Sequence, residues 1–117
     1  MSPTQDCIFC RIARGELGVS LLHEDPDVVA FADTAPQAPV HVLVIPRRHI
    51  ASLGASSPED DAVLGSLLTA ARKVAREMGV AETGYRTVIN SGSDAGQSVH
   101  HLHLHVLAGR QLRWPPG

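Results

Sequence analysis

The sequence is poor in the features that mark several large classes of protein. It contains two cysteines in 117 residues, too few for the disulfide framework that stabilises small secreted domains. It contains two phenylalanines, one tyrosine and one tryptophan, so few rings are available to stack on bases. Its 10 basic residues are outnumbered by 12 acidic ones, which leaves no excess of positive charge for a phosphate backbone. These shortages argue against a nucleic-acid partner.

Long apolar runs are absent as well. No segment approaches the roughly 20 apolar residues of a membrane-spanning helix, and residues 1–6 have neither the basic nor the apolar part of a signal peptide. Both absences predict a cytoplasmic protein with no membrane partner. The length of 117 residues predicts one domain, over residues 1–117.

The two cysteines, Cys7 and Cys10, form a C-x-x-C pair. In a cytoplasmic protein this spacing is typical of half a metal site or of a redox pair. A redox pair of the thioredoxin type follows a strand, and the six residues before Cys7 are too few for one. Half of a metal site is therefore the favoured interpretation.

The spacing of apolar residues predicts two helices and five strands. The helices are expected over residues 7–14 and 58–78, the second capped by Ser57 and buried along a stripe that includes Leu68 and Met78. Strands are expected over residues 20–24, 27–31, 41–45, 85–90 and 99–107. This order predicts an α+β fold with a five-stranded antiparallel sheet. The long helix covers one face of such a sheet and leaves the other face for a ligand or for solvent.

The most distinctive segment reads His-Leu-His-Leu-His. Alternate side chains of a strand share a face, so His101, His103 and His105 are expected on one face. Leu102 and His100 are expected on the other. Three neighbouring imidazoles need hydrogen-bond partners or a task, because a buried polar group without a partner costs free energy. Two chemistries fit: ligation of a catalytic metal, and a nucleophilic imidazole that its neighbours orient.

The loop before the histidines contains Gly92, Gly96 and Ser98. Glycines let backbone N–H groups approach an anion closely, and a serine adds a hydroxyl donor. The loop lacks the Gly-Lys-Ser/Thr ending of a P-loop. Because it leads directly into the histidine segment, it predicts a phosphate-binding loop.

Residues 96–107 (Gly-Gln-Ser-Val-His-His-Leu-His-Leu-His-Val-Leu) resemble the signature of the histidine triad superfamily. Four further segments resemble its histidine triad nucleotide-binding protein branch: Cys-Ile-Phe-Cys-Arg-Ile from Cys7, Phe-Ala-Asp ending at Asp33, residues 38–50, and the terminal residues 110–117. The cysteine pair is similar to that of bacterial members that hold zinc. The resemblance implies a homodimer and the activity of a purine nucleoside phosphoramidase.

The implied reaction cleaves the P–N bond of adenosine 5′-phosphoramidates and releases AMP. His103 would attack the α-phosphorus and form a covalent nucleotidyl-histidine, while His105 and Ser98 stabilise the developing charge. His101 and His41 complete the implied catalytic set. The nucleotide-binding residues expected are Asp33 at the ribose, Asn90, Gly96, Gln97 and Ser98 at the phosphate, Phe9, Ile12 and Phe31 at the base, and Trp114, which would reach the other subunit's site.

No cofactor is implied for the chemistry itself. A structural zinc is implied on Cys7, Cys10, His49 and His101, a closed set that leaves no open position for substrate. Other functions stay open at this point. A dinucleoside polyphosphate hydrolase or nucleotidyl transferase would use His103 on P–O bonds, and a nucleotide-binding module would not need it for catalysis. A metal-dependent hydrolase would be built on His101 and His103.

Overall fold

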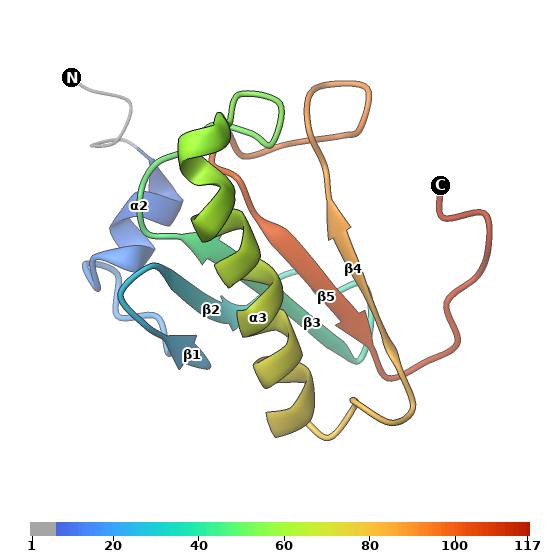
Figure 1. Cartoon of the computed structure of the whole chain (residues 1–117). Coiled ribbons are helices and arrows are strands. Elements are labelled where there is room, and N and C mark those ends of the chain that lie inside the picture. The colour runs from blue at the N-terminus through green and yellow to red at the C-terminus, as the bar shows by residue number, and fades with distance from the viewer. Residues whose placement is uncertain (1–6) are drawn as a thin grey trace.

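The computed structural model describes residues 7–117, so the expectation drawn from residues 1–6 lies outside it. Within that range no helix is long and apolar enough to cross a membrane. The sheet has five strands in the order β1-β2-β3-β5-β4, and each neighbouring pair is antiparallel, which confirms the predicted fold. The elements, drawn in Figure 1, are α2 (Ile8–Ala13), β1 (His23–Glu24), β2 (Val28–Ala32), β3 (Val40–Pro46), the 3₁₀ turn η1 (Pro58–Asp60), α3 (Asp61–Glu77), β4 (Tyr85–Ile89) and β5 (Leu104–Ala108).

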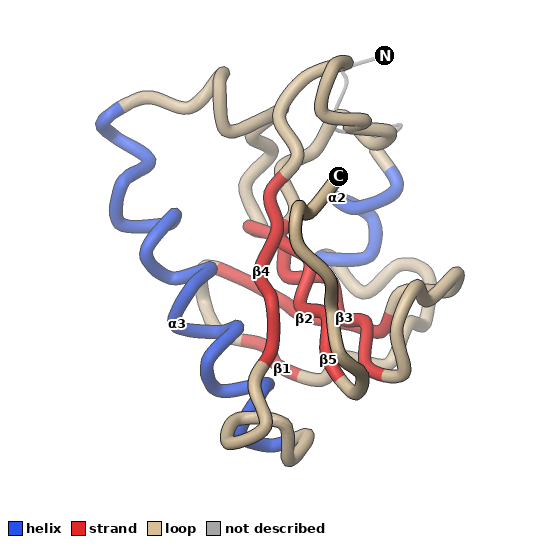
Figure 2. The backbone as a smooth tube through the Cα atoms, turned by 90° about the vertical axis from the view of Figure 1, so that its right-hand side faces the viewer, coloured by secondary structure: helices blue, strands red, loops and turns tan. Residues whose placement is uncertain are grey.

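The side chains of the central strand β3 point alternately to the two faces of the sheet. Leu43 lies opposite Phe31 of β2 and His105 of β5, and it packs with the short helix α2. The next residue, Val44, packs with the long helix α3 on the other face. Figure 2 shows the two helices on opposite sides of the sheet. Within residues 7–117, α2 is the one helix over the face that carries His105, and its 6 residues leave room for a cavity.

The long helix begins after a 3₁₀ turn and packs along a narrow seam. The backbone N–H of Ser57 donates to the Asp60 carboxylate (2.9 Å), as in a capping box. The prediction that Leu68 and Met78 are buried is wrong, because they are 56% and 41% exposed. Leu68 lies on the helix outside the seam, the strip of residues that touches the sheet, and Met78 is the C-cap that follows the helix. The residues of that seam are Leu67, Ala70, Ala71 and Val74.

The histidine segment is less regular than the alternation predicts. The strand expected over residues 99–107 begins only at Leu104, and the one expected over residues 20–24 contains only His23 and Glu24. Before β5 the Leu102 N–H donates to the Ile50 carbonyl (2.7 Å), which lies after the end of β3. The parity argument for His100 therefore fails. His100 is exposed and lines a hollow with Cys7, whereas Leu102 is buried in the core.

The C-terminal residues follow the outer edge of the sheet. The chain leaves β5 through Gly109, whose φ of 95° lies in the left-handed region, and passes beside β4 (Figure 1). The Arg86 guanidinium of β4 donates to the Arg113 carbonyl (3.0 Å) and holds the tail there. Trp114 is 81% exposed, so its ring is available for a contact outside this chain.

Candidate active site

A cavity of about 300 Å³ lies between α2 and the uncovered end of the sheet. Its polar lining residues include His103 and His105, and its apolar wall includes Phe9 and Phe31. Lining residues that were expected from the sequence are Phe9, Ile12, Phe31, Asp33, Ser98, His103 and His105. Those that the sequence did not single out are Ile8, Ala32, Thr34, Leu43 and Val99. For Leu43 a signal was present, since it shares strand parity with His41.

His103 is held in one orientation by its backbone neighbour. Its Nδ1–H donates to the carbonyl oxygen of His101 (2.8 Å). A carbonyl only accepts hydrogen bonds, so Nδ1 carries the proton, and Nε2 of the neutral ring keeps its lone pair. The edge-to-face contact with Phe9, with ring centroids 5.2 Å apart, supports the ring from the side. An imidazole held in this way has the orientation that a nucleophile requires.

A chain of hydrogen bonds sets the proton on His105. The Gln37 backbone N–H donates to Nδ1 of His41 (3.0 Å), so the proton of His41 must sit on Nε2. That Nε2 lies 2.9 Å from Nδ1 of His105 and donates to it. The remaining nitrogen of His105, Nε2, then carries the proton and acts as a donor in the cavity wall.

The surroundings keep His105 neutral. Burial, together with the neighbouring His103 and His41, lowers the pKa of His105 to about 4 against the opposing effect of Asp33. The two carboxylate oxygens of Asp33 have different neighbours. Its Oδ1 accepts from the Ala35 N–H (2.8 Å), and its Oδ2 lies 3.4 Å from Nε2 of His41.

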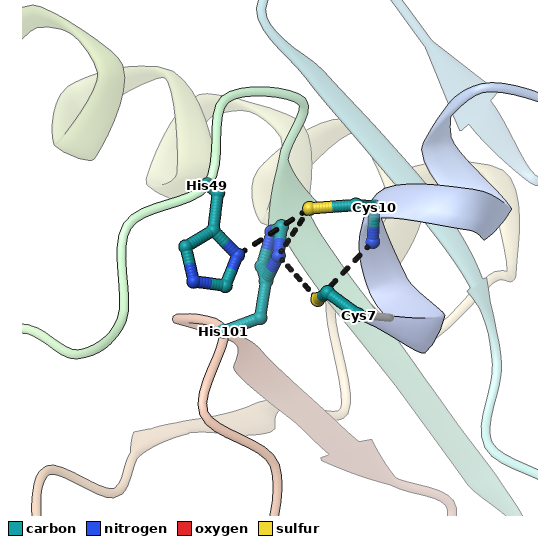
Figure 3. Close-up of side chains that lie close together, drawn as sticks. All are labelled: Cys7, Cys10, His49 and His101. Atoms are coloured by element: carbon teal, nitrogen blue, oxygen red, sulfur yellow. Dashed lines mark hydrogen bonds between the residues drawn. The ribbon is translucent and has the colours of Figure 1, made fainter. Parts of the chain in front are cut away.

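Four side chains converge beside the cavity in a second cluster, the Cys/His cluster (Figure 3): Cys7, Cys10, His49 and His101. Nδ1 of His101 lies 3.2 Å from the Cys7 sulfur and 3.4 Å from the Cys10 sulfur. Nδ1 of His49 lies 3.3 Å from the Cys10 sulfur. Zinc bonds of about 2.0 Å to nitrogen and about 2.3 Å to sulfur place tetrahedral ligands about 3.3–3.8 Å apart, so the spacing fits.

The protonation of the Cys/His cluster also suits a metal. The Nε2–H of His101 donates to the Pro46 carbonyl (2.9 Å), which leaves the lone pair on Nδ1, facing the sulfurs. Burial lowers the pKa of His101 to about 4, so this ring is neutral, as a ligand must be. Burial, with the hydrogen bond and charge of Cys7, raises the pKa of Cys10 to about 11. A cation would remove that proton and stabilise the thiolate.

A second group with metal-ligand spacing does not fit a metal. Asp33, His41 and His105 offer ligand atoms within 4.8 Å of one another. However, the Gln37 N–H occupies the lone pair of His41 Nδ1, so His41 Nε2 carries a proton and cannot ligate. Among residues 7–117, no metal-ligand group joins His101 to His103, which leaves a metal-dependent hydrolase on those two residues without a site.

The loop of residues 90–98 contributes Ser98 to the cavity lining, whereas Asn90, Gly96, Gln97 and Trp114 are not among the residues that line it. Gln97 acts within the loop. Its amide N–H groups donate to the carbonyls of Ala51 (2.8 Å) and Val99 (3.0 Å), and its side-chain oxygen accepts from the Gly92 N–H (2.9 Å). Gln97 therefore ties the loop to the segment after β3 and so positions Ser98.

The fold and the site together define a class: an α+β protein that presents an oriented imidazole to a cavity with apolar walls. The model of the HIT domain family matches residues 14–112, and the chain belongs to that family. An uncharacterized HIT-like protein of Synechocystis sp. is 49% identical over 113 residues, which are 97% of this chain and 98% of that protein.

Solved structures are similar over nearly the whole chain. A HIT family hydrolase from Legionella pneumophila is 46% identical with a TM-score of 0.92, covering 96% of this chain and all (100%) of that one. A histidine triad nucleotide-binding protein from Candida albicans is 32% identical with a TM-score of 0.80, over 94% and 83% of the two chains. A zinc-bound histidine triad family protein from Mycobacterium smegmatis is 34% identical with a TM-score of 0.76, over 92% and 77%.

Proposed function

We propose that this chain is a hydrolase of purine nucleoside phosphoramidates that acts through a covalent intermediate on His103. One observation carries the proposal. The Nδ1–H of His103 is bonded to the His101 carbonyl, so Nε2 keeps its lone pair, and the ring lines the cavity. The similarity to a Legionella pneumophila protein described as a HIT family hydrolase supports hydrolytic chemistry.

The cavity suits a nucleotide. Phe9, Ile12 and Phe31 offer apolar walls for a purine, which gains from contact with flat or branched apolar groups. Asp33 lies on the same lining and would accept hydrogen bonds from ribose hydroxyls. The similarity to a nucleotide-binding protein of Candida albicans supports this ligand class.

The reaction divides into two displacements at phosphorus. Nε2 of His103 attacks the α-phosphorus, the P–N bond breaks, and the leaving nitrogen takes up a proton from solvent and departs as the amine; the water of the second step returns a proton to solvent. Water then attacks the nucleotidyl-histidine and releases AMP, and His103 regains its lone pair. The donors His105 Nε2–H and the Ser98 hydroxyl line the cavity and would bond the phosphoryl oxygens or the leaving nitrogen, where charge develops.

We further propose that the Cys/His cluster holds a structural zinc. Four protein ligands close the coordination sphere, and when bound the metal would link α2 to the sheet. The zinc-bound relative from Mycobacterium smegmatis supports this assignment. No step of the reaction needs the metal, because the lone pair of His103 is oriented by a backbone carbonyl.

We also propose a homodimer. β4 is an outer strand of the sheet, and an outer strand offers unpaired backbone groups to a second chain. The C-terminal tail lies beside β4 through Arg86 and presents the exposed Trp114. A second copy at this edge would receive that ring, in line with the role expected for it from the sequence.

The test measures AMP release from adenosine 5′-phosphoramidate by the wild type, H103A and the control S66A, each with and without a chelator. Ser66 lies on α3, where its hydroxyl donates to the Ala62 carbonyl (3.1 Å), so S66A should keep full activity. H103A should lose at least about a thousandfold in kcat, because a missing nucleophile is not replaced by its neighbours. Wild-type turnover should survive the chelator as long as circular dichroism shows a native fold.

Three results would contradict the proposal in different ways. Activity in H103A would show that another group is the nucleophile. Activity that disappears with chelator while the fold persists would assign the chemistry to a metal. AMP binding without turnover would indicate a nucleotide-binding module, and turnover restricted to dinucleoside polyphosphates would indicate a P–O hydrolase.

A further inference from the structure

Helix α2 takes part in both the Cys/His cluster and the cavity. Cys7 and Cys10 are three residues apart and belong to the Cys/His cluster, while Phe9 and Ile12, also three apart, line the cavity. Cys7 caps the 6-residue helix and Cys10 lies in its first turn, whereas the side chains of Phe9 and Ile12 share a face of the helix. A bond that fixes the cysteines therefore also fixes the apolar wall against which the purine is proposed to lie.

His101 makes a second connection between the two sites. Its ring lies at 3.2 and 3.4 Å from the two sulfurs, and its backbone carbonyl accepts the Nδ1–H of His103. The residue has no exposed surface (0%), so its ring and its backbone are both confined by packed neighbours. The Leu102 N–H, bonded to Ile50 (2.7 Å), fixes the same backbone from the other side.

The ring of Phe9 makes a third connection. Its centroid lies 5.9 Å from that of His101 and 5.2 Å from that of His103, edge to face in both pairs. Phe9 lies between the two cysteines in the sequence and is 7% exposed. A shift of α2 would therefore withdraw the ring that supports the nucleophile.

We propose that metal binding at the Cys/His cluster and nucleotide binding in the cavity are coupled, so that each ligand raises the affinity of the protein for the other. His101 and Phe9 act as positioning residues in this coupling. The inference rests on the proposed function only in that a nucleotide occupies the cavity. Coupling between sites is reciprocal, and typical factors are about 5- to 150-fold. A metal that served stability alone would change the melting temperature without changing the affinity of folded protein for AMP.

The first experiment measures the dissociation constant of AMP by calorimetry for zinc-loaded and metal-free protein. We expect metal removal to weaken AMP binding by about tenfold. The reverse measurement, zinc affinity by chelator competition with and without saturating AMP, should give the same factor. AMP is the product, so neither measurement depends on turnover. Equal affinities for AMP in both folded forms would overturn the coupling.

The second experiment keeps the protein loaded, in case the metal-free chain does not hold its fold. Cobalt replaces zinc, and its visible absorption bands report the geometry of the ligands. Saturating AMP should change the intensity of these bands in the wild type, because His101 is bonded to His103. F9L should reduce that change, whereas V63A, which trims a partly buried residue packed on the other face of the sheet, should keep it. Unchanged bands at saturating AMP would overturn the proposal.

The outcomes separate this inference from the proposed function. If the chain binds AMP with coupling but does not cleave phosphoramidates, the coupling holds and the proposed function fails. If it cleaves them and AMP affinity is independent of the metal, the reverse is true. If zinc-loaded protein does not bind AMP at all, both are overturned.

Discussion

At the scale of single residues, backbone groups decide which nitrogen of each imidazole carries the proton. His101 and His103 each donate to a carbonyl, of Pro46 and of His101, so their other nitrogens hold lone pairs. His41 instead accepts a hydrogen bond from a backbone N–H at Nδ1, and its Nε2–H donates to His105. Since carbonyls only accept and N–H groups only donate, neighbouring rings acquire different roles.

This assignment makes a prediction for His105. H105A should lower kcat with adenosine 5′-phosphoramidate by about 100- to 1000-fold, because a donor aimed at developing charge is lost. H105Q should lose about tenfold less than H105A, because the glutamine amide can place an N–H near the position of Nε2. The measurement is kcat for the two variants under saturating substrate. Equal losses would show that the imidazole acts through something other than its Nε2–H.

At the scale of elements, the turn after β5 depends on a close approach between two segments. Gly109 has a φ of 95°, and a Cβ built there would lie 2.7 Å from the Cβ of Pro39. Pro39 belongs to the loop that leads into β3 and His41. The absence of a side chain at Gly109 therefore lets the end of β5 pack against that loop.

The prediction compares two glycines with positive φ. G109A should lower the free energy of unfolding by about 2–4 kcal/mol, because backbone strain adds to an overpacked contact. G79A, with a φ of 74° and nothing within 4 Å of the added Cβ, should cost only about 1–2 kcal/mol for the strain. Urea unfolding of both variants provides the measurement. Equal costs would mean that Pro39 moves aside freely.

At the scale of the whole molecule, the two faces of the sheet differ in the kinds of side chain that they bury. The face under α3 packs valines and leucines of three strands with the seam of the helix. The face under α2 combines a second apolar cluster with buried imidazoles, of which His101 and His103 are 0% and 5% exposed. Burial of groups that can ionise links the stability of this face to pH.

Acidification should therefore destabilise the metal-free protein. The pKa of His105 is lowered to about 4 by burial, whereas in the unfolded chain a histidine titrates near pH 6.5. The unfolded state binds more protons between these values, so the free energy of unfolding falls as pH falls from about 6.5 towards 4. For His105, which keeps some exposure, we expect a loss on the order of 1 kcal/mol between pH 6.5 and 5.

Urea unfolding at pH 7.5, 6 and 5 would measure this dependence in the wild type and in H105Q. Glutamine does not titrate, so H105Q should show a shallower decrease. The decrease that remains should come from other histidines, with His101 the main candidate, since burial lowers its pKa to about 4 as well. A decrease of the same size in both proteins would remove His105 from the explanation.

Much of the architecture could be predicted from local patterns. The β-rich run of residues 41–45 predicts a strand, and the helical spacing around Leu67 identifies the core face of its helix; Val44 and Leu67 are both buried in the core. The prediction failed where a tertiary hydrogen bond overrides the pattern. Leu102 bonds Ile50 rather than a ladder partner, so β5 starts late and His100 leaves its expected face. Leu68 is exposed because the sheet covers only a narrow strip of the helix surface. The width of that strip depends on the sheet as well as on the helix.

The sequence by itself determined the alternation of the histidines, the C-x-x-C pair and the order of helices and strands, because these depend on residue types at fixed spacing. Only the tertiary structure decided which nitrogen of each of the three histidines carries the proton. The bond of His101 to Pro46 spans 55 positions, and that of His41 to His105 spans 64. Which nitrogen keeps its lone pair depends on these distant groups, so the fold prepares similar side chains for the different roles proposed for them: nucleophile, donor and metal ligand.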